Sequence, residues 1–444
     1  MQQRDKDNPS NLIREVGLFS ATMLVVANMV GTGIFTTSGF IMKELQNPWT
    51  MLVCWFVGGI FALCGALCYG ELGAMFPKAG GEYVFLRESF GSLIAFLSGW
   101  ISLIVGFSAP IAASAIAFST YFFRMIQVPP SWSTVTILSS VVILIFSVVH
   151  YHSLYLGTRV QNILTVFKIT LIVIFVIMGL LIGNGSMSHF SFAMDFDLSF
   201  QEKFAVSLIF VYFAYSGWNA ASYIGGEIKN PKRNIPFSLF IGTILVMCLY
   251  LFLNLIYIYA LNIEQMSGVL EVGTKAAEAL FGNGIAKYFS GAIAIIILSS
   301  LSAMIMTGPR VYYAMAKDGV FFDFLGKVNK SHRTPVYSIF LQAGIAIIMV
   351  ITASFDRLLL YIGFTLSLFS MLSVVGMMVL RFRRPFVERS YNTFGYPVTP
   401  LLFVLGNLWI IYFSIIKRPI SSIFGLGTIV SGILIYLYFK ERKG

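Results

Sequence analysis

The chain has 444 residues, of which 57% are apolar and only 11% are charged. Soluble domains carry about 25% charged residues, so the composition excludes an ordinary soluble enzyme or binding module. Apolar runs of about 20 residues recur along the whole chain, as is typical of membrane-spanning helices. The net charge of +11 would suit a nucleic-acid partner, but most basic residues lie between spans on one predicted side of the membrane. We therefore interpret this charge as orientation by the positive-inside rule, with both termini cytoplasmic.

Twelve membrane spans are predicted, and no second, soluble domain is visible. The spans cover residues 17–41, 50–74, 92–123, 133–153, 158–182, 204–226, 236–261, 285–309, 335–354, 358–380, 397–416 and 421–439. A polar segment, 1–16, precedes them and a short tail, 440–444, follows them. The first apolar run continues past signal-peptide length without a small-residue cleavage site, so we expect no cleaved leader. The expected location is the plasma membrane.

Residues 28–35, with the sequence NMVGTGIF, interrupt the first predicted span. Each glycine in a helix interior costs about 1 kcal/mol relative to alanine. Backbone groups freed in lipid cost several kcal/mol each unless they find a partner. Such a break is tolerated where it faces protein or a watery cavity, and we predict that it forms half of a binding site.

The sixth span repeats this irregularity at residues 213–219, with the sequence FAYSGWN. Spans 1 and 6 stand five apart, as the first members of two five-helix halves would. Interrupted helices at corresponding positions of two halves indicate the midplane site of a secondary transporter. Glycines that merely permit close helix packing would explain one such span. For two spans at this spacing, the binding site is the better interpretation.

Three segments between spans carry motifs of their own. Residues 69–83 form a turn-rich segment after span 2. Residues 263–282 have helical periodicity and are expected to form a helical outer lid. Residues 308–319 are expected to form a basic cytoplasmic loop. We interpret most residues in these segments as solvated turns.

These motifs together resemble those of the amino acid–polyamine–organocation superfamily. The similarity rests on residues 28–35, 69–83, 213–219, 227–236 and 308–319, and it covers spans 1 through 10. The sixth-span run is most similar to the L-type amino acid transporter branch and its bacterial relatives. The resemblance implies an all-α, LeuT-like fold with broken helices 1 and 6. Its inverted five-plus-five repeat would place the halves at 17–182 and 204–380 and two extra helices at 397–439, with alternating access for amino acids.

The chemistry of the two breaks suits an α-amino acid. The amides of Thr32, Gly33 and Ile34 would begin the second half-helix of span 1, and such a start attracts a carboxylate. Carbonyl groups freed at the breaks would face the ammonium, and they belong to Met29, Phe213, Ala214 and Ser216. No charged side chain is required for either end of the zwitterion.

The resemblance assigns roles to several of these residues. It implies that Thr32 and Gly33 bind the carboxylate, that Phe213 forms a gate, and that Met29, Phe213 and Ser216 bind the amine. Asn28, Asn219 and Ser108 are candidates for shaping the side-chain pocket. No Asp or Glu lies in the middle of any predicted span, and an unpaired buried charge is costly. Neutral amino acids are therefore the expected cargo, and Gly33→Val is expected to abolish binding while leaving a folded protein.

Lys168 lies about ten residues inside span 5, which is about 15 Å at 1.5 Å per residue. Its stem is too short to snorkel that far with ease, so a function is the default hypothesis. The alternative is an idle lysine turned toward a wet crevice. By resemblance, its ammonium replaces a sodium ion, with carbonyls near Ala27 or Gly31 and the Ser300 hydroxyl as partners. Sodium-independent transport follows, and a proton-linked role stays open because desolvation disfavours the charged form.

Cofactors and partners leave little signal. The four cysteines are expected to be buried, inert thiols, and the four histidines lack metal-site spacing, so we expect no cofactor or metal. Animal L-type transporters use a cysteine between spans 3 and 4 to hold a single-span glycoprotein. Residues 121–132 contain none, so we expect no disulfide-linked heavy-chain subunit.

Two function classes stay open. The first is a sodium-independent carrier of neutral L-amino acids, with exchange as the expected mode and proton symport as the alternative. The second is an intramembrane enzyme or sensor on the same scaffold. Substrate-stimulated counterflow separates the two.

Overall fold

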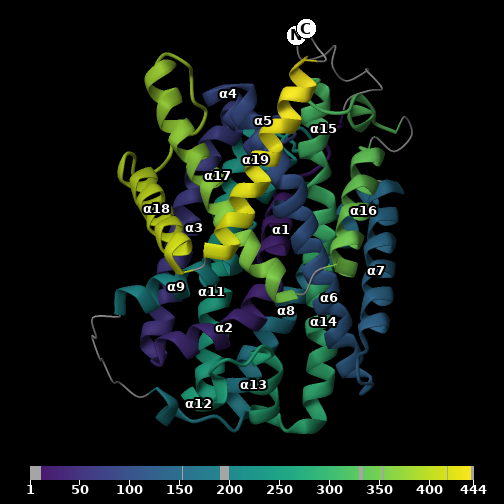
Figure 1. Cartoon of the computed structure of the whole chain (residues 1–444). Coiled ribbons are helices and arrows are strands. Elements are labelled where there is room, and N and C mark those ends of the chain that lie inside the picture. The colour runs from purple at the N-terminus through teal and green to yellow at the C-terminus, as the bar shows by residue number, and fades with distance from the viewer. Residues whose placement is uncertain are drawn as a thin grey trace.

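The computed structural model describes residues 12–152, 154–190, 200–329, 334–352, 355–417 and 419–441. Within these ranges the chain is all α-helical, and two isolated β-bridges are the only strand-like pairings (Figure 1). Ten helices in this part of the chain are long and apolar enough to cross a membrane. The chain is therefore a multi-pass membrane protein, as predicted. The count of twelve spans and the inverted repeat stay predictions.

The first half of the chain holds eight α-helices and one π-helical segment. They are α1 (Leu18–Met29), α2 (Thr32–Leu45), α3 (Pro48–Met75), α4 (Glu82–Phe90), α5 (Ser92–Ile101), the π-helical η1 (Ser102–Ser108), α6 (Ala109–Met125), α7 (Trp132–His152) and α8 (Leu154–Ile182). The segments α5, η1 and α6 follow one another directly and form one long span, Ser92–Met125.

The second half begins with a 3-10 turn, η2 (Met187–His189). Its further elements are α9 (Phe200–Tyr215), α10 (Ala220–Tyr223), α11 (Pro231–Ala260), α12 (Ile263–Met266), α13 (Val272–Phe281), α14 (Asn283–Thr307), α15 (Pro309–Lys317), the 3-10 turn η3 (Asp323–Gly326), α16 (Val336–Thr352), α17 (Phe355–Arg383), α18 (Val398–Lys417) and α19 (Pro419–Glu441). Helices α12 and α13 occupy the segment 263–282, for which a helical lid is predicted.

Burial separates inner from outer helices. Of the most apolar 18-residue stretch, 78% is buried in α1–α2, in α5–α6 and in α14–α15, against 22% in α7 and in α19. A helix that is apolar all round is stable inside such a bundle or against lipid. In Figure 1, α1 runs through the middle of the bundle and α7 lies at its side. The interrupted helix α1–α2 therefore belongs to the interior.

The prediction of a solvated loop at residues 308–319 is wrong for most of its length. Pro309 opens α15, where its missing N–H leaves no hydrogen bond unmade, and the helix runs to Lys317. The Arg310 side chain is buried because Nε and Nη2 donate to the Glu227 carboxylate at 3.2 and 2.9 Å. A buried charge of this kind is held by its partner rather than by water.

The segment 69–83 is also mostly buried, against the prediction of solvated turns. Glu71 belongs to α3 and accepts a 2.9 Å hydrogen bond from Arg381 of α17. Residues 79–83 are buried, and Lys78 is the exposed residue of the segment. Ala79 pairs with Ile224 in one of the two β-bridges. This pairing places the start of α4 beside the end of α10.

Candidate functional site

The first span is interrupted where the glycines predict it. Helix α1 ends at Met29 and α2 begins at Thr32, with Val30 and Gly31 outside both helices. The first N–H groups of a helix have no acceptor within the helix. The amides of the first residues of α2 are therefore at the break, as the sequence suggests.

The second interruption separates α9 from the single turn of α10. Residues 216–219 form a turn, and Gly217 has a φ of +97°, a region that favours glycine. A β-carbon at Gly217 would lie 2.8–2.9 Å from atoms of Asn28, and one at Gly33 would lie 2.6 Å from the Ala214 Cα. Each break thus presses a glycine against the other break, so the two interruptions are in direct contact.

This contact corrects the expectation for Gly33→Val. The new side chain would collide with the Ala214 backbone, which cannot turn aside as a flexible side chain can. The substitution would separate α2 from α9. We therefore expect Gly33→Val to disturb the fold itself, and not only the binding of substrate.

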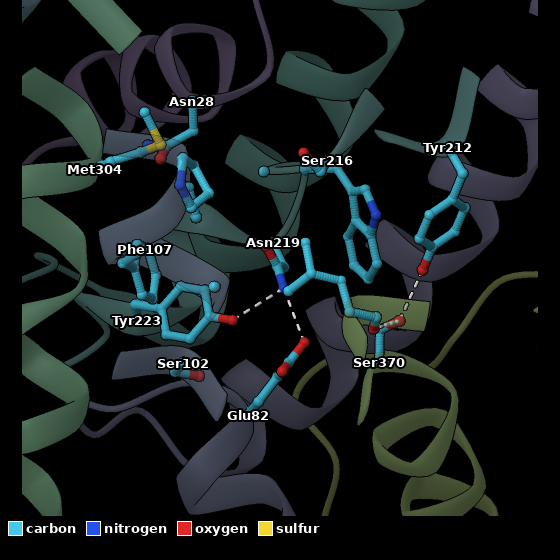
Figure 2. A pocket seen from close by; sticks show the side chains of 16 residues that line it. Asn28, Glu82, Ser102, Phe107, Tyr212, Ser216, Asn219, Tyr223, Met304 and Ser370 are labelled. Atoms are coloured by element: carbon cyan, nitrogen blue, oxygen red, sulfur yellow. Dashed lines mark hydrogen bonds between the residues drawn. The ribbon is translucent and has the colours of Figure 1, made fainter. Parts of the chain in front are cut away.

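A cavity of about 70 Å³ lies beside the two breaks (Figure 2). Its lining residues are Asn28, Glu82, Ser102, Gly106, Phe107, Pro110, Tyr212, Ser216, Gly217, Trp218, Asn219, Ala220, Tyr223, Met304, Leu366 and Ser370. Of the predicted substrate-binding residues, the cavity reaches Asn28, Ser216 and Asn219. The other six, Met29, Thr32, Gly33, Ile34, Phe213 and Ala214, are not in its lining, and neither is Ser108.

Three carbonyl groups predicted to be free at the breaks are hydrogen bonded in this structure. The Tyr250 hydroxyl of α11 lies 2.6 Å from the Met29 carbonyl oxygen and 2.9 Å from that of Ala214. The Phe213 carbonyl accepts from the Ser216 amide at 3.0 Å. Tyr250 escaped sequence analysis because one tyrosine in a long apolar run carries no signal. It bridges the two breaks from a neighbouring helix.

Lys168 and Ser300 meet at the end of α1. The buried Lys168 ammonium donates to the carbonyl oxygens of Ala27, at 3.2 Å, and Val30, and it lies 3.3 Å from the Ser300 hydroxyl. The Ser300 hydroxyl oxygen lies 2.8 and 2.7 Å from the same two carbonyl oxygens, so its single proton can be donated to either one. The structure thus brings together the residues expected here, with Val30 rather than Gly31 as the second carbonyl.

Glu82, the first residue of α4, is a cavity residue that sequence analysis missed. Its side chain is 5% exposed, and it accepts hydrogen bonds from the Tyr69 hydroxyl at 2.6 Å and the Asn219 amide at 3.0 Å. Burial raises the pKa of this carboxyl to about 7, although hydrogen bonds from Tyr69, Asn219 and Tyr223 act against the rise. The Gly80 amide donates to the Tyr223 carbonyl at 2.9 Å, which holds α4 at the cavity.

Cysteines and metal-ligating groups add no second site in the described part of the chain. No group of three His, Cys, Asp or Glu side chains there could hold a metal ion. Cys54, Cys64 and Cys68 are buried, but Cys248 is exposed on α11, so the expectation of buried thiols is wrong for Cys248.

A cavity at two interrupted helices, inside a bundle of membrane-spanning helices, is the arrangement of a membrane transporter. The profile of the amino acid permease family matches residues 16–438, nearly the whole chain. The chain belongs to this family, within the amino acid–polyamine–organocation superfamily that the motifs indicate. The family is one of transporters, so the prediction that the protein is not an enzyme is confirmed.

Three similar proteins illustrate the family. The large neutral amino acids transporter small subunit 2 of Mus musculus is 29% identical, with 97% of this chain and 82% of that protein aligned. The b(0,+)-type amino acid transporter 1 of Homo sapiens is 30% identical, over 99% and 91%. The serine/threonine exchanger SteT of Bacillus subtilis is 29% identical, over 98% of each.

Proposed function

We propose that this permease is a sodium-independent exchanger of neutral L-amino acids that works by alternating access at the two helix breaks. The observation that carries the proposal is the cavity lined by Asn28 of the first break and Ser216, Gly217 and Asn219 of the second. Two of the similar proteins are named for neutral substrates, and SteT is named an exchanger. Their names support both parts of the proposal.

The zwitterion would bind mainly to backbone groups. Its carboxylate meets the amides of Thr32, Gly33 and Ile34 at the start of α2, where the helix dipole favours negative charge. Its ammonium meets Met29, Phe213 and Ser216 carbonyls, and Phe213 closes over it. Since Tyr250 contacts the Met29 and Ala214 carbonyls in this structure, its hydroxyl must move aside or remain as a bridge when substrate binds.

Sodium independence rests on Lys168. Its ammonium contacts two main-chain carbonyl oxygens and the Ser300 hydroxyl, and oxygen ligands of this kind would otherwise suit a hard cation. A fixed positive charge there repels a second cation. Proton-coupled symport is the second candidate, and the observation that favours it is Glu82 in the cavity wall.

Further features complete the proposal. We assign the protein to the plasma membrane with both termini cytoplasmic, with the inverted repeat at 17–182 and 204–380 and without a disulfide-linked subunit. The absence of a cysteine between residues 121 and 132 supports the last point.

Counterflow in proteoliposomes tests the function. Vesicles loaded with one unlabelled amino acid, taken in turn from the twenty, are placed in a labelled neutral amino acid with and without sodium. We expect labelled uptake to be stimulated by internal neutral amino acids and equal in both media. Uptake that needs sodium, or that no internal amino acid stimulates, would contradict the proposal.

A further inference from the structure

Glu82 is a buried acid in the cavity wall that the binding scheme above does not use. We propose that Glu82 is a proton-binding site of the transport cycle, which takes up a proton when the cavity closes and releases it when the cavity opens to water. This inference rests on the proposed function, because the cavity is assumed to open and close with transport.

The hydrogen bonds around Glu82 leave room for a proton. Two of the donors, the Tyr69 hydroxyl and the Asn219 amide, converge on Oε1 at 2.6 and 3.0 Å, and the Tyr223 hydroxyl also interacts with the carboxyl. An acid protonated on Oε2 can still accept both bonds at Oε1. Figure 2 shows the carboxyl group turned toward Asn219 beside Tyr223. The two hydrogen bonds to Oε1 are therefore kept whether the carboxyl is charged or neutral.

The titratable groups around the Glu82 carboxyl are neutral. The titratable groups that interact with it are tyrosines from three elements: Tyr69 of α3, Tyr212 of α9 and Tyr223 of α10. A phenol hydroxyl near neutral pH carries no charge. No lysine, arginine or histidine of the described residues lies within ion-pair distance of Glu82.

Among the described side chains, the cations of the elements packed against α4 have partners of their own. On α17, Arg381 pairs with Glu71, and on α15, Arg310 pairs with Glu227. Lys317 of α15 lies over the Tyr313 ring. On α4 itself, Arg87 and Glu88 form an ion pair, and Arg87 also binds Asp318. These cations are thus engaged elsewhere, and a proton is the cation left to neutralise Glu82.

The direction of the pH effect follows from linkage. In this structure the pKa of Glu82 is about 7, whereas a water-exposed glutamate has a pKa of about 4.3. A state in which Glu82 is buried, as it is here, therefore binds the proton more tightly than a state in which water reaches the carboxyl. Closure is favoured as pH falls through 7, and lowering the pH from 8 to 6 should favour it about tenfold.

The test compares counterflow of a neutral amino acid from pH 5.5 to 8.5 in wild type, Glu82→Gln and Glu88→Gln. Glutamine keeps the oxygen that Tyr69 and Asn219 contact and mimics the protonated acid. The wild-type rate should rise up to about tenfold as pH falls from 8 to 6, and it should continue to rise toward pH 5.5. Glu82→Gln should be flat at the rate of the protonated wild type, and Glu88→Gln, on the same helix but outside the cavity, should follow the wild type.

A direct proton measurement guards against a folding defect in the variant. Wild-type protein is mixed with saturating amino acid and a pH indicator in weakly buffered detergent at pH 7. It should take up part of a proton per molecule as the cavity closes over the amino acid. Glu82→Gln should bind the amino acid and take up no proton. A pH profile or proton exchange that survives in Glu82→Gln would overturn the inference. Absence of counterflow in the wild type at every pH would instead refute the proposed function.

Discussion

At the scale of single residues, Lys168 holds the loose end of α1. The last carbonyl groups of a helix have no N–H donor within the helix. Here the Ala27 and Val30 carbonyls receive theirs from the Lys168 ammonium and the Ser300 hydroxyl. One cation thereby stabilises the broken backbone deep inside the bundle.

Replacing this cation should therefore stop transport. In Lys168→Met the side chain keeps its length but no longer donates to the Ala27 and Val30 carbonyls. The Ser300 hydroxyl, with its single proton, then has to serve both carbonyls, so the end of α1 is held less firmly. We expect counterflow to fall to background with and without sodium, while Lys232→Met, at an exposed lysine, keeps the wild-type rate. Unchanged flux in Lys168→Met would show that the lysine is idle.

The residues differ in how visible they are in the sequence. Lys168 can be predicted because a charge in the middle of an apolar run stands out. Glu82 cannot be predicted, because it lies between spans among turn residues. Its burial depends on contacts with Tyr69 and Asn219, which belong to other elements. The nearest signal is the pair Gly80 and Gly81, both at positive φ, which permits a sharp return of the chain.

At the scale of elements, the contact between the two breaks is the central feature. Gly217 combines a positive φ with close approach to Asn28. Gly268 has a similar φ of +72°, but a β-carbon there would meet only Lys43 Cδ, at 3.5 Å. Comparing substitutions at the two glycines therefore separates the effect of backbone strain from the effect of losing the contact between Gly217 and Asn28.

Alanine at each glycine makes a matched pair of variants. Both substitutions should cost about 1 kcal/mol of backbone strain. Gly217→Ala should also push α10 away from α1 and abolish counterflow, whereas Gly268→Ala should transport normally. Equal counterflow by the two purified variants would contradict a functional contact at the breaks.

The buried pair between Arg310 of α15 and Glu227, after α10, joins two elements near the site. Removing the arginine leaves a buried carboxylate unpaired, which typically costs about 3–5 kcal/mol. We expect Arg310→Met to lower the thermal unfolding midpoint strongly. Lys417→Met breaks the more exposed pair with Glu202 and should cost at most about 1 kcal/mol. Similar melting shifts for both variants would refute this ranking.

The interruptions in α1–α2 and α9–α10 are predictable because glycines and polar residues stand out within apolar runs. The helix α15 is not, since Gly308, Pro309 and two basic residues read as a turn. Pairing with Glu227 makes Arg310 compatible with a buried helix, and that partner lies 83 residues away in the chain. Contacts at such separation decide what local patterns leave open.

At the scale of the whole molecule, the interrupted pair α1–α2 and the span α5–α6 beside the cavity are mostly buried, whereas α7 and α19 present most of their apolar surface outward. The helical membrane class can be read from composition and apolar runs alone. The residues that line the cavity cannot be read from the sequence in this way, because they come from segments spread between Asn28 and Ser370.

Substrate protection of a cavity thiol tests most directly whether an amino acid occupies this cavity. The four native cysteines are first replaced by serine. Then either Ser216→Cys, in the cavity lining, or Ser133→Cys, at an exposed position in the first turn of α7, is introduced. A saturating neutral amino acid should slow thiol labelling in Ser216→Cys and leave it unchanged in Ser133→Cys. Labelling of Ser216→Cys at the same rate with and without every transported amino acid would contradict binding at the two breaks.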